Sequence, residues 1–119
     1  MIKLSIKGGS VPMKEIKPFY FTEYGQEEAS VTLEADMKYQ LFEKHGIAPN
    51  GYSWTHVLQT YLATSQPAIA KSIKYDSEAG MFACTGPKEL VKQAAMCFSE
   101  LYNNEVLLEE ILSNLSLQH

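Results

Sequence analysis

Two pairs of short segments with alternating apolar and polar residues constrain the fold of this chain most strongly. The first pair covers residues 17–24 and 29–34, and the second covers residues 72–76 and 81–85. Alternation with a period of two is typical of strands that bury one face, and a short polar turn between two such segments favours an antiparallel hairpin. The sequence therefore predicts two β-hairpins.

Two helical patterns follow each pair of strands. Their apolar residues recur three and four positions apart, which is typical of a helix with one buried face. The patterns cover residues 37–45 and 53–64 after the first pair, and residues 88–102 and the chain from Glu105 onward after the second. Asp36 and Asn104 are predicted to cap the first and last helices. The order ββααββαα predicts an α+β fold, in which an antiparallel sheet built from two hairpins has helices packed on one face.

Length and composition indicate a single domain. The chain has 119 residues, of which 45% are apolar and 20% are charged. One hydrophobic core serves a chain of this length, and such a composition excludes intrinsic disorder and a coiled coil as the overall class. We therefore predict one α+β domain over residues 13–119.

Residues 1–12 are predicted to lie outside this domain, because the sequence Gly-Gly-Ser-Val-Pro at residues 8–12 is a break signal. One interpretation is a disordered tail. The other is a translated leader, since Lys-Gly-Gly at residues 7–9 can be encoded by a purine-rich ribosome-binding sequence, with Met13 following three codons later. The codons of these residues decide between the two.

The charged residues argue against binding to nucleic acid. All ten basic residues are lysines, and 14 acidic residues bring the formal net charge to −4. Without arginine the chain lacks the side chain that binds phosphate with paired hydrogen bonds, and its acidic balance repels a phosphate backbone.

The apolar runs are shorter than the roughly 18 residues of a membrane span, and the first residues do not form a secretory signal. We therefore expect a cytoplasmic protein that contacts neither nucleic acid nor membrane.

The sequence has no recognisable catalytic or metal-binding motif. His45, His56 and His119 are not spaced as zinc ligands, and Cys84 and Cys97 are not spaced as a metal or redox pair. Phosphate-binding, dinucleotide-binding and nucleophile-elbow motifs are missing as well. We therefore predict a non-enzymatic protein without a cofactor or a metal.

Charge is unevenly distributed along the chain. Residues 13–36 carry a net charge of −4, residues 37–74 carry +3, and residues 75–119 carry −5. Both acidic blocks begin with a predicted hairpin, so we expect their acidic turns to lie together on one side of the sheet. This pattern is either ordinary solvated charge or a surface that steers the protein toward a basic partner.

Three stretches taken together resemble the Imm51 family, the immunity proteins of bacterial polymorphic toxin systems. They are Lys17-Pro18-Phe19, Asn50-Gly51-Tyr52-Ser53-Trp54 and Tyr75-Asp76-Ser77-Glu78-Ala79-Gly80-Met81-Phe82. Family members tend to have an aspartate before the tryptophan and a Phe-Asp-Pro-Glu hairpin, and here Ser53, Tyr75 and Ser77 occupy those places. The similarity spans nearly the whole domain.

The resemblance implies a small cytoplasmic protein that binds a cognate toxin domain, protects the producing cell and performs no catalysis. Trp54, Asp76 and Glu78 match positions in the family's motifs. The phase of Trp54 with Leu58 and Leu62 along the helix favours a place in the core, and Asp76 is typical of a turn residue.

An inhibitory complex requires exposed aromatic anchors and charge complementary to the partner. Tyr20 and Tyr24 share the outer face of the first predicted strand, and Glu23, Glu27 and Glu28 lie at its turn. These five residues are the predicted partner-binding site. If this face is buried in a homodimer, the tyrosines belong to that interface instead.

Two other functions stay open at this stage. One is a small-ligand-binding or regulatory domain with an aromatic-lined pocket beside Tyr52 and Trp54. The other is a hydrolase that uses a carboxylate and His56.

Overall fold

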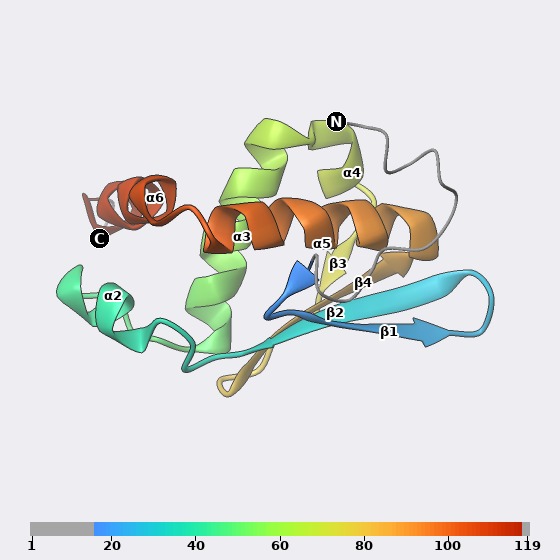
Figure 1. Cartoon of the computed structure of the whole chain (residues 1–119), viewed down its shortest axis with the longest axis horizontal. Coiled ribbons are helices and arrows are strands. Elements are labelled where there is room, and N and C mark those ends of the chain that lie inside the picture. Colours follow the sequence, from blue (N-terminus) through green and yellow to red (C-terminus); the bar gives the residue numbers. More distant parts are fainter. Residues whose placement is uncertain (1–15, 118–119) are drawn as a thin grey trace.

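The computed structural model describes residues 16–117, so the predictions for residues 1–12 lie outside the described residues. Four strands form one antiparallel sheet in the order β1-β2-β4-β3 (Figure 1). The strands are β1 (Tyr20–Tyr24), β2 (Glu28–Glu34), β3 (Lys74–Tyr75) and β4 (Met81–Pro87). The two predicted hairpins are confirmed, and they join side by side because β2 pairs with β4 over its whole length.

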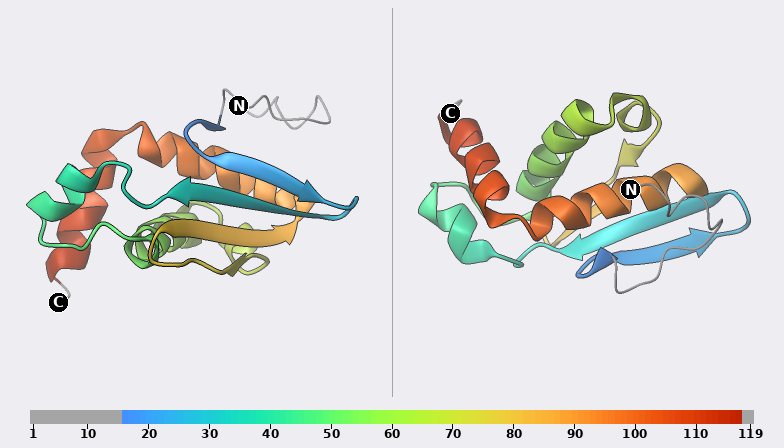
Figure 2. Two further views of the ribbon diagram at one scale, coloured as in Figure 1. Left: turned by 90° about the horizontal axis from the view of Figure 1, so that it is seen from below. Right: turned by 45° about the horizontal axis from the view of Figure 1, so that its top comes forward.

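Within residues 16–117, five helices accompany the sheet. They are α2 (Tyr39–Lys44), α3 (Gly51–Ser65), α4 (Pro67–Ala70), α5 (Lys88–Tyr102) and α6 (Glu105–Leu117). Seen from below, the sheet lies in front of the helices (Figure 2, left), so the predicted α+β arrangement with helices on one face is confirmed. Within residues 16–117, no helix has the length and apolar character that crossing a membrane requires.

The core lies between the sheet and helices α3 and α5. Alternate residues of the strands face it, as the period-two pattern predicts, and the helices contribute their apolar stripes. Among the fully buried side chains are Val31, Leu33, Phe82, Trp54, Leu58, Leu62 and Phe98. Phe98 packs edge-on against Phe82, with 5.6 Å between ring centroids. Full burial of one such side chain contributes about 1.5–3 kcal/mol.

The first helix begins later than predicted, and Asp36 does not cap it with its side chain. Met37 and Tyr39 donate backbone hydrogen bonds to the carbonyl groups of Glu34 and Asp36 and thereby form turns. Lys38 then adopts a left-handed conformation, with φ of 55°. Because a left-handed residue interrupts a right-handed helix, α2 begins only at Tyr39.

The segment between α3 and β4 also differs from the prediction. The chain after Gln66 forms the short helix α4, which the sequence patterns did not predict and which Pro67 permits because the first helical position needs no hydrogen-bond donor. Strand β3 has two residues rather than five. The hydroxyl group of Ser77 accepts the backbone N–H of Ala83 at 2.9 Å, which takes the place of a ladder hydrogen bond. At the end of β4, Pro87 is the N-cap of α5, which begins at Lys88 as predicted.

Candidate partner-binding surface

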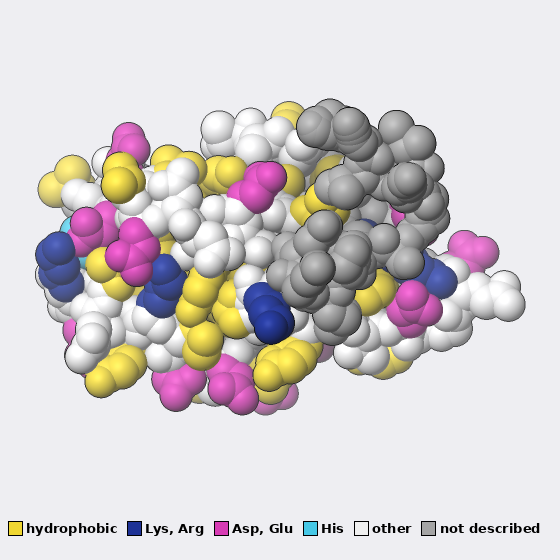
Figure 3. Space-filling model, viewed as in Figure 1, with side chains coloured by type: hydrophobic (Ala, Val, Ile, Leu, Met, Phe, Trp, Pro, Cys, Tyr) yellow, Lys and Arg dark blue, Asp and Glu magenta, His cyan; other side chains and the backbone are white. Residues whose placement is uncertain are grey.

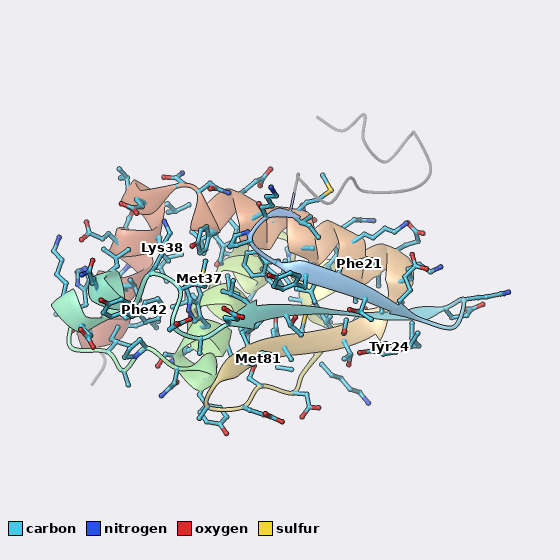
Figure 4. The ribbon with its side chains drawn as sticks, turned by 60° about the horizontal axis from the view of Figure 1, so that its bottom comes forward. Phe21, Tyr24, Met37, Lys38, Phe42 and Met81 are labelled. Carbon is cyan, nitrogen blue, oxygen red and sulfur yellow. The ribbon has the colours of Figure 1, made fainter. Side chains whose placement is uncertain are left out.

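One face of the sheet has no described helix packed on it, and we call it the helix-free face. Directly paired residues of antiparallel strands point to the same side, so the strand register identifies the members of this face. They are Tyr20, Thr22 and Tyr24 of β1, Glu28, Ser30, Thr32 and Glu34 of β2, Met81, Ala83, Thr85 and Pro87 of β4, and Lys74 of β3. The face is seen from its own side in Figure 4.

Two tyrosines stand at the β1 edge of this face. Tyr20 is 59% exposed and Tyr24 is 56% exposed. The Ser30 hydroxyl group donates a hydrogen bond of 3.2 Å to the Tyr24 hydroxyl group, which orients that ring toward the neighbouring strand (Figure 4). Both tyrosines therefore offer the aromatic surface that sequence analysis predicted.

Carboxylates border the helix-free face at both ends. Glu28 lies at the end where Pro87 pairs with it, and Glu34 lies opposite Met81 at the other end. The turn between β1 and β2 adjoins the first end, and the turn between β3 and β4 adjoins the second. The two acidic turns therefore lie at opposite ends of the sheet rather than beside each other, because the antiparallel pairing of β2 with β4 separates them.

The predicted partner-binding residues do not all share this face. Tyr20, Tyr24 and Glu28 do. Glu23 pairs with Ala29 on the opposite side of the sheet, where its carboxylate accepts a charged hydrogen bond of 3.5 Å from Lys88. Glu27 is exposed in the turn itself. The structure thus places three members of the predicted set on the helix-free face, Glu27 at its rim and Glu23 on the opposite side of the sheet.

Trp54 lies in the core. It is fully buried, with its ring 4.7 Å from that of Phe42 and stacked at 5.9 Å on Tyr102, measured between ring centroids. Because no part of its side chain reaches solvent, Trp54 cannot contact a partner directly.

Asp76 and Glu78 lie on the β3–β4 turn, on the same side as the helix-free face. The Asp76 backbone N–H donates to Ala83 at 2.9 Å, and Glu78 exchanges two backbone hydrogen bonds with Met81. Each acidic residue therefore pairs with a β4 residue whose side chain belongs to that face. The partner-binding set and the hairpin acids, which sequence analysis treated separately, meet on one surface.

Gly51 holds this turn in place, and the sequence analysis missed its role. Its backbone N–H donates to the Ala79 carbonyl group at 2.9 Å. A Cβ atom at Gly51 would lie 1.9 Å from the Glu78 carbonyl oxygen and 2.4 Å from that of Met81. Only glycine permits this close approach of the two backbones. The signal in the sequence that could have indicated it is a glycine at the first residue of a helix.

Ion pairs attach α2 to α6, away from the helix-free face. Lys38 Nζ lies 3.0 Å from Glu105 Oε2, and Lys44 Nζ lies 2.5 Å from Glu109 Oε2. His45 Nε2 is 3.4 Å from the same Glu109 oxygen. The hydrogen bond from Lys44, with a smaller contribution from His45, holds the pKa of Glu109 below its usual value. These contacts fix the position of a helix of only six residues.

Within residues 16–117, Tyr52 and Trp54 do not face a common pocket. Trp54 is buried, whereas Tyr52 is 58% exposed at the start of α3. His56 borders a hollow whose other described lining residues are Thr60, Ile111, Asn114, Leu115 and Leu117, so no carboxylate side chain of residues 16–117 lines it. Between residues 16 and 117, no three His, Cys, Asp or Glu side chains gather where they could hold a metal ion.

The two cysteines are free thiols. Burial raises the pKa of Cys84 to about 12 and that of Cys97 to about 11. Both groups therefore stay protonated near neutral pH, which suits packing rather than nucleophilic chemistry.

Comparison with known proteins identifies one family. Residues 19–117 match the family model of immunity protein 51, Imm51. Neither a curated protein nor a solved structure matches the chain. Because the match covers most of the chain and includes every strand and helix described above, this protein belongs to the Imm51 family.

Proposed function

We propose that this protein is a non-enzymatic immunity protein of a polymorphic toxin system, which binds a cognate bacterial toxin domain in the cytoplasm and neutralises it. Family membership supports a role in immunity. The observation that carries the proposal is the helix-free face, which presents two exposed tyrosines beside carboxylates.

Tyr20 and Tyr24 are the proposed anchors of the complex. Tyrosine is enriched among residues that dominate binding energy, because it buries a large area and loses little conformational freedom. The hydrogen bond from Ser30 already restrains the Tyr24 ring in the free protein, which lowers the entropy that binding costs. Glu28 adds charge on the same face, and Glu27 adds it at the rim.

The size of an ordinary interface requires more than the tip of the first hairpin. A specific complex buries about 800 Å² on each partner. The helix-free face is about 24 Å long and about 19 Å wide, from seven residues of β2 and four strands at standard strand dimensions. This plane area is smaller than 800 Å², so a partner needs the whole face, including the end near Asp76 and Glu78, together with its rim.

Co-expression with the toxin domain encoded by a neighbouring gene tests the function. We expect wild-type protein to restore growth and the Tyr20→Ala/Tyr24→Ala variant to protect poorly. The matched control is Tyr39→Ala/Tyr52→Ala, which removes two other exposed tyrosines from α2 and α3. Growth that does not depend on the wild-type protein would refute the proposed function.

The predicted site is tested by direct binding. Charge reversal of Glu27 and Glu28 combined with Tyr24→Ala should weaken binding of the toxin domain by at least tenfold and leave the urea unfolding midpoint unchanged. Wild-type affinity in this folded variant would place the interface elsewhere.

A further inference from the structure

We infer that the toxin surface covered by the helix-free face is cationic and is the surface with which the toxin binds a polyanionic substrate. This inference rests on the proposed function and adds the chemistry of the partner. It also shifts the centre of binding from the tip of the first hairpin toward the β3–β4 turn.

The helix-free face and its β3–β4 turn carry a net negative charge. Four carboxylates lie on it or on its β3–β4 turn, against the single ammonium group of Lys74, for a net charge of −3. The carboxylates are Glu28, Glu34, Asp76 and Glu78. This small part of the surface therefore accounts for most of the net charge of −4 of the whole chain.

Within residues 16–117, none of the four carboxylates forms an ion pair, although the ammonium group of Lys74 lies on the same face. The ion pairs of this part of the chain lie on the helices or between a helix and the rim, and they join Lys38 to Glu105, Lys44 and His45 to Glu109, Lys88 to Glu23, and Lys92 to Glu89. Acidic side chains also gather along the lower edge of the molecule in Figure 3, on the side of the sheet away from the helices.

The negative electrostatic potential of the face is strongest near the β3–β4 turn. Glu34 and Glu78 both pair with Met81, so their backbones lie about 10 Å apart, two strand spacings. Asp76 is two residues from Glu78, which is about 7 Å along the chain. These separations are close to the Debye length of about 8 Å at physiological ionic strength. The three carboxylates therefore act together, whereas Glu28 lies about 20 Å away along β2.

The middle of the face is polar. Its residues are Thr22, Ser30, Thr32, Ala83 and Thr85. A second copy of this chain is a poor occupant, because homodimer interfaces are more apolar and because two copies would oppose their carboxylates. A partner with a basic surface gains both charge attraction and hydrogen bonds to the hydroxyl groups.

A basic surface on the toxin explains how binding would inhibit the toxin. An enzyme gathers positive charge where it binds a polyanionic substrate, because that charge steers the substrate into the site. An immunity protein with an acidic face is attracted to the same place, and its presence there excludes the substrate. The partner is thus a toxin that acts on a polyanion.

Charge-neutralised variants test the location. The face variant is Glu34→Gln/Asp76→Asn/Glu78→Gln, and the control is Glu43→Gln/Glu100→Gln/Glu110→Gln, three exposed carboxylates on helices. Both variants change the net charge by the same amount. Calorimetry with the toxin domain at 50 and 300 mM salt, after equal urea midpoints confirm folding, should show at least tenfold weaker binding and a smaller salt effect for the face variant.

The outcomes separate this inference from the proposed function. The control should bind within about twofold of wild type. Equal losses in both variants, or no loss in the face variant, would overturn the inference and leave the function intact. A toxin domain that does not bind even the wild-type protein would overturn both.

Heparin is the probe for the polyanion-binding surface. We expect heparin to displace the wild-type protein from the toxin domain in a concentration-dependent way. If heparin binds the toxin and the complex persists, the toxin binds polyanions elsewhere, and this part of the inference is wrong.

Discussion

Replacing Gly51 by alanine tests how the start of α3 holds the β3–β4 turn. The new Cβ atom would lie 1.9 Å from the Glu78 carbonyl oxygen, whereas ordinary contact begins at 3.4 Å. The turn must therefore withdraw by about 1.5 Å, the difference between these two distances. That movement breaks the 2.9 Å hydrogen bond from Gly51 to Ala79.

Two contributions set the expected loss of stability. A lost hydrogen bond costs about 1 kcal/mol, and overpacking against rigid backbone costs about 1–3 kcal/mol. The better helix propensity of alanine offsets about 1 kcal/mol of this, so we expect the free energy of unfolding to fall by about 2 kcal/mol. For a domain of this size, this lowers the Tm by about 8 °C.

Urea unfolding followed by circular dichroism measures the effect, and Gly80→Ala is the matched control in the same turn. A Cβ atom at Gly80 meets nothing within 4 Å, so the control should change stability by no more than about 0.5 kcal/mol. Equal unfolding midpoints for the two variants would refute the reasoning, because the clash at Gly51 would then have no energetic consequence.

Three further predictions concern the core, one ion pair and the thiols. Trp54→Ala should reduce the free energy of unfolding by about 3–5 kcal/mol. Trp54→Phe should reduce it by clearly less, because the buried indole N–H has no hydrogen-bond partner within residues 16–117 that the variant would lose. Equal losses for the two variants in urea unfolding would contradict this prediction. Glu109→Gln should destabilise the protein at pH 7, and this difference from wild type should shrink as the pH falls below about 4. The hydrogen bond from Lys44 lowers the pKa of the Glu109 carboxyl group in the folded protein. The stabilisation is therefore fully present above the pKa of this group in the unfolded chain, and it is lost as the pH falls through the lower pKa of the folded protein. A stability difference that stays constant with pH would count against this prediction. Iodoacetamide at pH 8 should modify the partly exposed Cys97 slowly and the buried Cys84 more slowly still, as followed by mass spectrometry. Modification rates equal to those of the urea-unfolded chain would contradict the burial of these thiols.

Local patterns in the sequence predicted the strands and most of the helices. Alternation placed Val31 and Leu33 in the core, and helical phase placed Trp54 there with Leu58. Such signals depend on neighbours along the chain, so they are present in the sequence itself. The left-handed Lys38 shortened α2 against this expectation, because no local pattern identifies a lysine that adopts a positive φ.

The pairing of β2 with β4 could not be predicted in the same way. These strands are separated by α2, α3, α4 and β3, and register across such a connection depends on tertiary packing rather than on a turn. The pairing decides which acidic residues meet. It sends the two acidic turns to opposite ends of the sheet and brings Glu34 near Glu78.

Only part of the candidate site could be predicted, because its composition also depends on contacts between distant parts of the chain. Strand alternation is sufficient to place Tyr20 and Tyr24 on one face. It does not reveal that Glu23 meets Lys88, since these residues are far apart in the sequence. Charge sums over chain segments also hide ion pairing, so they could not distinguish neutralised carboxylates from those that stay available to a partner.

The most direct test of the central claim is an NMR titration of the ¹⁵N-labelled protein with the toxin domain. We expect the largest amide shifts in β1, β2, β4 and the β3–β4 turn, with Tyr20, Tyr24 and Glu78 among them. Shifts confined to the exposed faces of α3, α5 and α6 would contradict the claim that the helix-free face of the sheet binds the toxin.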